Sequence, residues 1–364
     1  MSPTPLANST AAHAAAGAMS DAQKTEHIKA VVLKAGADLR QRHPWLRHQN
    51  AIGMGILLAS LAGMAGTAWL YLAGHLAWWL CLPVVAIFAS FTHELEHDLI
   101  HWMYFRKRLL LHHLMMALVW LARPSTINPW IRRTLHFRHH KYSGTEKDAE
   151  ERGITNGRPW GLARLLMLAD ATLALLLRVP QAKDRKHRLL LLIGGPIAYF
   201  PLGWAFWGLW YVFLGYHGAN AVAGLTGSEI AWSAATLARM QWLNPLVVVW
   251  IGPNVLRSFC LHFVSSNMHY YGDVEDDNVV QQTQVLNPWW LVPFQLFCFN
   301  FGATHAIHHF VVKEPFYVRQ WTAREAHTVM REMGVRFNDF GSFTRANRWT
   351  RAGETAADGL PAAG

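Results

Sequence analysis

Residues 76–101 read LAWWLCLPVVAIFASFTHELEHDLIH and join an apolar segment directly to three histidines. The apolar part, residues 76–92, carries no charged side chain. It is predicted to cross a membrane as a helix, because a backbone in lipid must satisfy its own hydrogen bonds. His93, His97 and His101 follow at intervals of four, which places three imidazoles on one stripe of the helix. The stretch therefore predicts a membrane protein whose polar site begins where a membrane helix ends.

Three further segments are apolar enough to span a membrane, namely 51–73, 189–216 and 243–264. Segment 285–304 is apolar too, but it contains two prolines and leads straight into histidines, so we expect it to be re-entrant or interfacial. Hydrophobic residues make up 52% of the chain and charged residues only 15%, which requires both a membrane part and a polar part. We expect an all-α integral membrane fold with four transmembrane helices and a cytoplasmic helical cap.

The net charge of +10 is distributed unevenly along the chain. In the expected loop 217–242, Arg239 is the single basic residue, and the predicted span 243–264 contains one, Arg257. The other Lys and Arg residues lie in 1–50, in 93–188 and after the last span. By the positive-inside rule, both termini and the histidines face the cytoplasm, and no nucleic-acid partner is needed to explain the charge. The predicted domains are a cytoplasmic tail (1–50), a catalytic domain (51–315) and a second cytoplasmic tail (316–364), with disorder expected in 352–364.

Ten of the 21 histidines fall in four groups, which include two HxxHH runs. The groups are 93–101, 136–140, the lone His269 and 305–309. In a helix, an HxxHH run can direct up to three imidazoles at one point. Eight or nine imidazoles exceed the number that one ion takes, so two ions are expected. Imidazole suits iron as well as zinc or copper, and we interpret the site as redox-active iron that activates O2.

This pattern resembles the membrane fatty acid desaturase and hydroxylase superfamily, whose signature is HxxxH or HxxxxH followed by two HxxHH boxes. Residues 136–143 (HFRHHKYS) are close to the second box of that family, and residues 302–309 (GATHAIHH) resemble its last box. The resemblance covers about residues 50–315. It implies a di-iron centre whose ligands are His93, His97, His136, His139, His140, His269, His305, His308 and His309.

The resemblance also implies an O2-dependent oxidation of fatty acyl chains. Desaturation to a C=C bond is the expected reaction, and oxidative decarboxylation of free fatty acids to terminal alkenes and hydroxylation are the alternatives. Two features depart from acyl-CoA desaturases: Ser265 stands where they tend to have Asn, and the first box has three intervening residues instead of four. His101 is a further candidate ligand. Ser265, Asp273 and Glu94 are candidates to hold the ligands by hydrogen bonds.

Other polar residues near the boxes have more ordinary interpretations. We expect His112 and His113 to be interfacial, and His262 either to support the site or to line a cavity. Four arginines are candidates to pair with a carboxylate head group or, equally, with a lipid phosphate; they are Arg123, Arg132, Arg133 and Arg138.

A different class of enzyme also fits one motif, because residues 93–97 (HELEH) satisfy the HExxH pattern of zinc proteases, in which the Glu is the general base. That interpretation leaves both HxxHH boxes without a role. Replacement of Glu94 by Gln distinguishes the two classes, since a protease loses its turnover and a di-iron oxidase retains its iron.

The need for an electron-donor partner follows from the absence of a redox-cofactor motif in the sequence. It shows no motif for flavin, NAD, an Fe–S cluster or a cytochrome b5 haem. We therefore expect an external electron donor, such as ferredoxin, cytochrome b5 or a similar carrier with its reductase. The cationic cytoplasmic face suits an acidic carrier. The expected substrate is a fatty acyl chain in the lipid bilayer.

Overall fold

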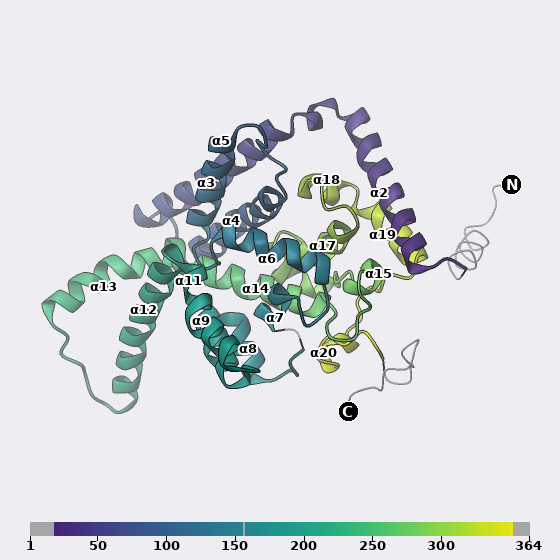
Figure 1. Cartoon of the computed structure of the whole chain (residues 1–364). Coiled ribbons are helices and arrows are strands. Elements are labelled where there is room, and N and C mark those ends of the chain that lie inside the picture. Colours follow the sequence, from purple (N-terminus) through teal and green to yellow (C-terminus); the bar gives the residue numbers. More distant parts are fainter. Residues whose placement is uncertain (1–17, 156, 352–364) are drawn as a thin grey trace.

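The computed structural model describes residues 18–155 and 157–351, and this part of the chain is helical, without a β-strand (Figure 1). The predicted all-α class is therefore confirmed. The expected disorder of 352–364 lies outside the described residues.

The first half of the described chain contains α2 (Asp21–Arg42), η1 (Pro44–Arg47), α3 (Gln49–Leu72), α4 (Trp78–Ile100), α5 (Leu109–Ala122), α6 (Pro129–Tyr142), α7 (Ala149–Ile154), α8 (Leu162–Ala169), α9 (Ala171–Arg178), η2 (Val179–Gln181) and α10 (Arg185–Leu189). The second half contains η3 (Leu190–Gly194), α11 (Gly195–Tyr199), α12 (Leu202–Leu225), α13 (Ala234–Leu246), η4 (Val247–Ile251), α14 (Gly252–Met268), α15 (Val279–Gln282), η5 (Trp289–Leu291), α16 (Val292–Leu296), α17 (Phe301–Phe310), α18 (Phe316–Trp321), α19 (Ala323–Glu332) and α20 (Gly341–Thr344). The turns η3 and η4 are π-helical.

Three described helices are long and apolar enough to cross a membrane. They are α3, α4 and a continuous helix Ala234–Met268 that combines α13, η4 and α14. The first two agree with the spans predicted at 51–73 and 76–92. The third is much longer than the predicted span 243–264, because α12 continues to Leu225 and α13 begins at Ala234. The loop expected at 217–242 is therefore reduced to residues 226–233, and α12 and α13 form a hairpin that extends from the rest of the fold (Figure 1).

The span predicted at 189–216 is not one straight helix in the structure. Arg185–Tyr199 and Leu202–Leu225 pass the test for a span only together, and they are bent by 96° at the break between them. Pro201 explains the break, because the residue before a proline is pushed out of the helical region, and Phe200 has an extended backbone with ψ of 141°. The fourth candidate is thus a broken span or a re-entrant pair.

Helix α4 is the central helix of the fold, in contact with α3, α5, α6 and α14. Its C-terminal part is buried, from Thr92 to Ile100. Glycines in α3 permit the close approach of α3 to its neighbours: a Cβ at Gly53 would lie 2.5 Å from the ring of Tyr104, and one at Gly63 would lie 2.4 Å from Phe88. The histidines at the end of α4 are therefore held rigidly inside the protein.

The two segments expected as tails contain folded helices. Ile28 and Val32 of α2 lie in the same buried core as Val329 and Met330 of α19. Arg40 anchors α2 through two hydrogen bonds, of 3.2 and 2.9 Å, to the Glu314 carboxylate. Because these residues bury apolar surface together, the described parts of these two segments pack on the same core as α17.

Segment 285–304 contains η5, α16 and the start of α17, and none of these is long enough to span a membrane. Gln295 holds the segment together, because its amide donates to the Leu286 carbonyl at 2.9 Å and accepts from the Gly302 N–H at 3.1 Å. The segment is thus a compact turn, and α17 begins at its end inside the protein.

Candidate metal centre

Eight histidines converge in two groups of four. One ligand nitrogen from each member lies within 4.8 Å of those of the other members of its group. The first group contains His97, His101, His136 and His308, and the second contains His139, His269, His305 and His309. They come from the ends of α4 and α14 and from helices α6 and α17, which are far apart in the sequence. The predicted convergence of separate histidine boxes is thus present in the structure.

The three histidines of the first box do not all join one group. His101, which caps the C-terminus of α4, joins His97 in the first group, whereas His93 belongs to neither. The Nδ1 atom of His93 lies 3.4 Å from the Glu94 carboxylate, and its ring packs near Phe301. The three residues share one helix stripe, and the box is shifted by one turn towards the end of α4, where α6 and α17 approach it.

This shift also bears on the HExxH interpretation. A zinc protease site needs His93 and His97 on the same ion, and the structure does not group these two residues within its described ranges. Glu94, the required general base, lies 3.6 Å from the Arg319 guanidinium and does not line the cavity beside the histidines. The geometry therefore does not support the protease.

His140, a predicted ligand, lies beside the first group without belonging to it. Its Nε2 atom is 3.1 Å from Nε2 of His136 and 3.0 Å from Nε2 of His308. The Nε2 atoms of His136 and His101 are also 3.0 Å apart. Ligand nitrogens bound at about 2.0–2.1 Å from one ion stand roughly 3 Å apart, so this spacing suits a shared cation.

The outer nitrogens of the histidines donate to acceptors around the site. His136 Nδ1 faces Glu150 at 2.8 Å, His139 Nδ1 faces Asp148 at 2.8 Å, and His309 Nδ1 faces Gln282 at 2.9 Å. A neutral imidazole that donates from Nδ1 has its lone pair on Nε2, which is the atom a metal binds. These acceptors therefore select the tautomer and fix the ring orientation that a metal site requires.

Helix α7 supplies most of these acceptors. Asp148 is its N-cap and accepts from the backbone N–H groups of Glu150 and Glu151. Glu151 lies 3.4 Å from Nδ1 of His269, which also contacts the Ser265 carbonyl at 2.9 Å. The acidic run that follows the second box by a few residues is the signal that could have identified Glu150 and Glu151, whereas Gln282 has no such signal.

The proposed supporting residues have different surroundings. The Ser265 hydroxyl lies 3.4 Å from His269 Nδ1. Asp273 instead accepts from the backbone N–H groups of Trp349 and Thr350, at 2.6 and 2.8 Å, and so fastens the C-terminal segment. Glu94 has Arg319 and His93 as its nearest charged or titratable partners.

The candidate arginines for a carboxylate head group are mostly engaged within the protein. Arg123 and Arg132 both pair with the buried Glu96, and Arg132 also lies 3.3 Å from Glu150. Arg133 donates to the Leu99 carbonyl and stacks over the Trp102 ring. Arg138 is exposed. The structure thus assigns internal electrostatic partners to the arginines that lie closest to the histidines.

The remaining histidines near the boxes are structural. His112 is fully buried, with Nδ1 at 2.8 Å from the Tyr104 carbonyl, so it is not interfacial as expected. His113 accepts from the Trp130 indole at 2.9 Å. His262 lines the cavity described below and contacts the Leu168 carbonyl at 3.3 Å.

The donor set fits a pair of metal cations. Both ring nitrogens of the buried His97 have no hydrogen-bond partner within the described part of the chain, which is costly unless a ligand binds there. Burial alone would lower the pKa of His139, but the Asp148 carboxylate raises it to about 9. The acids of α7 therefore favour positive charge among the imidazoles, and bound metal ions would supply that charge.

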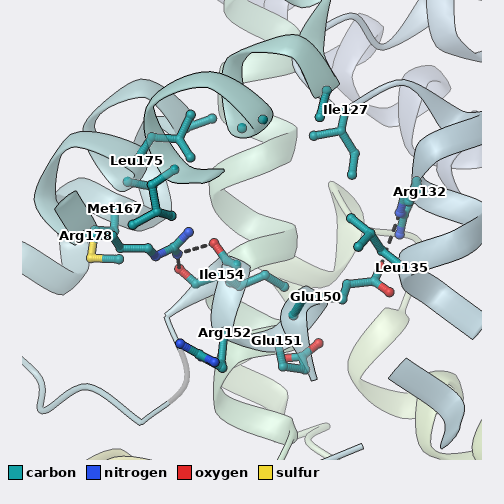
Figure 2. Close-up of a pocket in the computed structure, with 18 of the residues that line it drawn as sticks. Ile127, Arg132, Leu135, Glu150, Glu151, Arg152, Ile154, Met167, Leu175 and Arg178 are labelled. Carbon is teal, nitrogen blue, oxygen red and sulfur yellow. Dashed lines mark hydrogen bonds and ion pairs between the residues drawn. The ribbon is translucent and has the colours of Figure 1, made fainter. Parts of the chain in front are cut away.

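A cavity of about 1160 Å³ opens beside the histidines (Figure 2). His93, His136, His139 and His305 line one part of it. Its walls are largely apolar, and the apolar lining includes Ile127, Leu135, Met167, Ala174, Leu175, Leu190 and Leu261. A cavity of this kind suits a flexible hydrocarbon chain that must reach the histidines.

Comparison with protein families agrees with this site. The model of the fatty acid desaturase family matches residues 73–341, which is most of the chain and includes every histidine of both groups. A comparison with curated proteins gave no match. The match bears out the resemblance carried by the histidine boxes, and it makes the chain a desaturase-like oxidoreductase in general terms. The chain belongs to the fatty acid desaturase family.

Proposed function

We propose that this protein is a membrane-bound di-iron enzyme that uses O2 to introduce a C=C bond into a fatty acyl chain. The observation that carries the proposal is the convergence of two groups of four histidines beside one apolar cavity. Two groups favour two ions, and an all-imidazole ligand set suits iron. Family membership supports the oxidation of a fatty acyl substrate.

The first group would hold one iron, with His140 beside it, and the second group would hold the other. Bound iron would supply the reduction of O2 and the removal of hydrogen from an acyl methylene. The protein's own residues do the rest. Apolar side chains such as Leu135 and Leu261 hold the chain and exclude water. Asp148 and Glu150 accept the outer imidazole protons and keep the rings in place.

Product analysis tests this function directly. The chain is expressed in a host that is fed isotopically labelled fatty acids, and the purified protein is analysed for metals. We expect an internal alkene product and about two irons per chain, since roughly four ligands surround each ion. Release of labelled CO2 with a terminal alkene, or formation of an alcohol, would overturn desaturation but not the family. About one zinc and no iron would overturn the di-iron centre.

The electrons must come from a separate protein. We propose an acidic carrier such as ferredoxin or a cytochrome b5, supported by the basic excess of the polar segments. Attraction between exposed charges is screened by salt. Donor-dependent turnover should therefore fall as ionic strength rises, while turnover with a small uncharged reductant stays constant. Donor-dependent turnover that is insensitive to salt would contradict this partner. We further propose that both termini and the site face the cytoplasm.

A further inference from the structure

The cavity beside the histidines has two electrostatically different ends. Arg132 and Arg178 lie on opposite sides of it in Figure 2. At the histidine side, Arg132 is neutralised by Glu96 at 2.9 Å and Glu150 at 3.3 Å. Arg178 lies at the other side, and the lining also includes Arg152 and Arg158. None of these three arginines has a carboxylate partner within residues 18–155 and 157–351.

The three arginines donate only to neutral oxygens. Arg178 donates to the carbonyls of Gly153 and Ile154, the latter at 2.8 Å. Arg158 donates to the Leu177 carbonyl at 3.2 Å and to the Gln181 amide oxygen. Carbonyl acceptors orient a guanidinium without cancelling its charge, so this end of the cavity carries positive charge that the protein leaves uncompensated.

Nearby charges do not remove this excess. Lys183 also lines the cavity and pairs with Glu146 at 2.5 Å, while Lys186 adds another exposed cation. Asp184 is the acid that lines this end, and its carboxylate caps α10 by accepting from the His187 N–H at 2.6 Å. The pKa of Arg178 is lowered to about 10, chiefly by burial; Tyr199 acts in the opposite direction, and the charges of Arg158 and Arg152 contribute to the lowering. Arg178 remains protonated at neutral pH, and the charges of the other two guanidinium groups repel it.

We propose that Arg178 and Arg158 form the binding site for the anionic head group of the acyl substrate. The head group, a carboxylate or a phosphate, is held at the basic end while the hydrocarbon chain follows the apolar walls towards the histidines. Guanidinium groups bind both anions through paired, charge-assisted hydrogen bonds. At the histidine end, Arg132 is already paired with Glu96 and Glu150, so it offers the head group no unpaired cation. This inference rests on the proposed function for the identity of the ligand as an acyl substrate.

A binding measurement tests the site without any turnover. The full-length protein, with its metal content determined, is placed in lipid nanodiscs without oxygen or an electron donor. Binding of a labelled long-chain fatty acid, its methyl ester and its CoA thioester is compared between the parent and the variants Arg178→Gln and Arg158→Gln. Arg188→Gln is the matched control, because Arg188 is exposed on α10 and does not line this cavity.

Each Gln variant should weaken binding of the anionic ligand by roughly tenfold or more, since a lost charge-assisted hydrogen bond is worth at least that factor. Binding of the uncharged methyl ester should not change, and Arg188→Gln should behave as the parent. Weakened binding of the free acid identifies a carboxylate head group, whereas an effect confined to the CoA thioester identifies phosphate. Arg178→Lys, which retains the charge, should recover much of the affinity.

Two results would overturn the site. One is unchanged binding of both anionic ligands to the Arg178→Gln and Arg158→Gln proteins, and the other is an equal loss in Arg188→Gln. Because Arg178 also holds two carbonyls at the end of α7, thermal unfolding of each variant is measured. If the Arg178→Gln protein is unfolded, the binding measured with the Arg158→Gln protein tests the site. Arginine-dependent binding in this assay, combined with no oxidation of labelled fatty acids in the product analysis, would instead refute the proposed function and leave the site intact.

Discussion

Asp148 has two roles that a single carboxylate performs at once. One oxygen accepts the outer proton of His139 at 2.8 Å, and the other caps α7 by accepting from two backbone N–H groups. The cap places Glu150 and Glu151 next to His136 and His269. One residue thus fixes a ligand directly and positions the acids that contact two others.

Replacing Asp148 by Asn should therefore weaken metal binding. Asn retains an oxygen that can cap the helix, but it lacks the charge that favours metal-bound His139, so metal affinity should fall about 10–100-fold. The readout is iron content after dialysis against a graded chelator series. Asp273→Asn is the matched control, because Asp273 contacts the backbone of Trp349 and Thr350 and no histidine. Equal iron loss in the two variants would show that Asp148 acts through stability alone.

We predict opposite effects on iron content when His101 and His93 of the first box are replaced. His101→Ala removes a member of the first group and should lower the iron content towards one ion per chain, because a neighbouring ion keeps its full set of four ligands. His93→Ala should retain both ions, since His93 lies outside both groups. Metal analysis and Mössbauer spectra of the two purified proteins give the answer. Loss of iron in His93→Ala with full loading of His101→Ala would favour the original interpretation of the box.

At the scale of elements, the site depends on helices that reach it from opposite ends of the chain. His97 and His101 lie at the buried C-terminal end of α4. Three more histidines lie on α17, which begins within the segment 285–304. Helix α2 covers the core behind α17 and packs on α19. Each element buries an apolar stripe against the next, so the position of the ligands is determined by packing distant from them.

Truncation of a buried side chain in α2 should reveal this dependence. Ile28→Ala removes a fully buried side chain and should cost about 2–5 kcal/mol of stability. Leu33→Ala, in the same helix at a position that is 42% exposed, should change stability by less than about 1 kcal/mol. Thermal unfolding in detergent compares the two. A midpoint for Ile28→Ala that equals the Leu33→Ala value would mean that α2 does not support the core.

For the whole molecule, the centre joins four parts of the chain that are otherwise connected by long segments. It gathers ligands from α4, α6, the end of α14 and α17, and it collects the acids of α7 around them. Without metal ions, Asp148 and Glu151 have imidazoles as their charged or titratable partners, while Glu150 is also paired with Arg132. Bound ions would therefore stabilise the cap as well as perform chemistry.

Metal removal should accordingly destabilise the entire protein. An ion present at about 100 times its dissociation constant contributes roughly 2.7 kcal/mol to the folded state, and two ions contribute more. Chelation should lower the unfolding temperature by several degrees, and added Fe²⁺ should restore it. The Asp273→Asn protein should show the same shift as the parent. An unfolding temperature that chelation leaves unchanged would contradict a structural role for the ions.

Local patterns were sufficient to predict much of this protein. The length and hydropathy of 51–73 and 76–92 determine membrane-sized helices, because helix formation in lipid depends on each segment alone. The spacing of the HxxHH boxes determines which imidazoles share a helix face, and that pattern was enough to indicate the family. The break in 189–216 could have been predicted from Pro201, but the apolar composition alone gives no sign of it.

The tertiary structure alone decided which of these residues meet. His93, His97 and His101 are equivalent by periodicity, and only the approach of α6 and α17 brings the last two into a group. Glu150, Gln282 and Arg178 acquire their roles from neighbours more than ten residues away in the chain. Periodicity is a property of one helix, whereas convergence depends on how several helices pack, and that is why contacts between distant elements could not be read from the pattern.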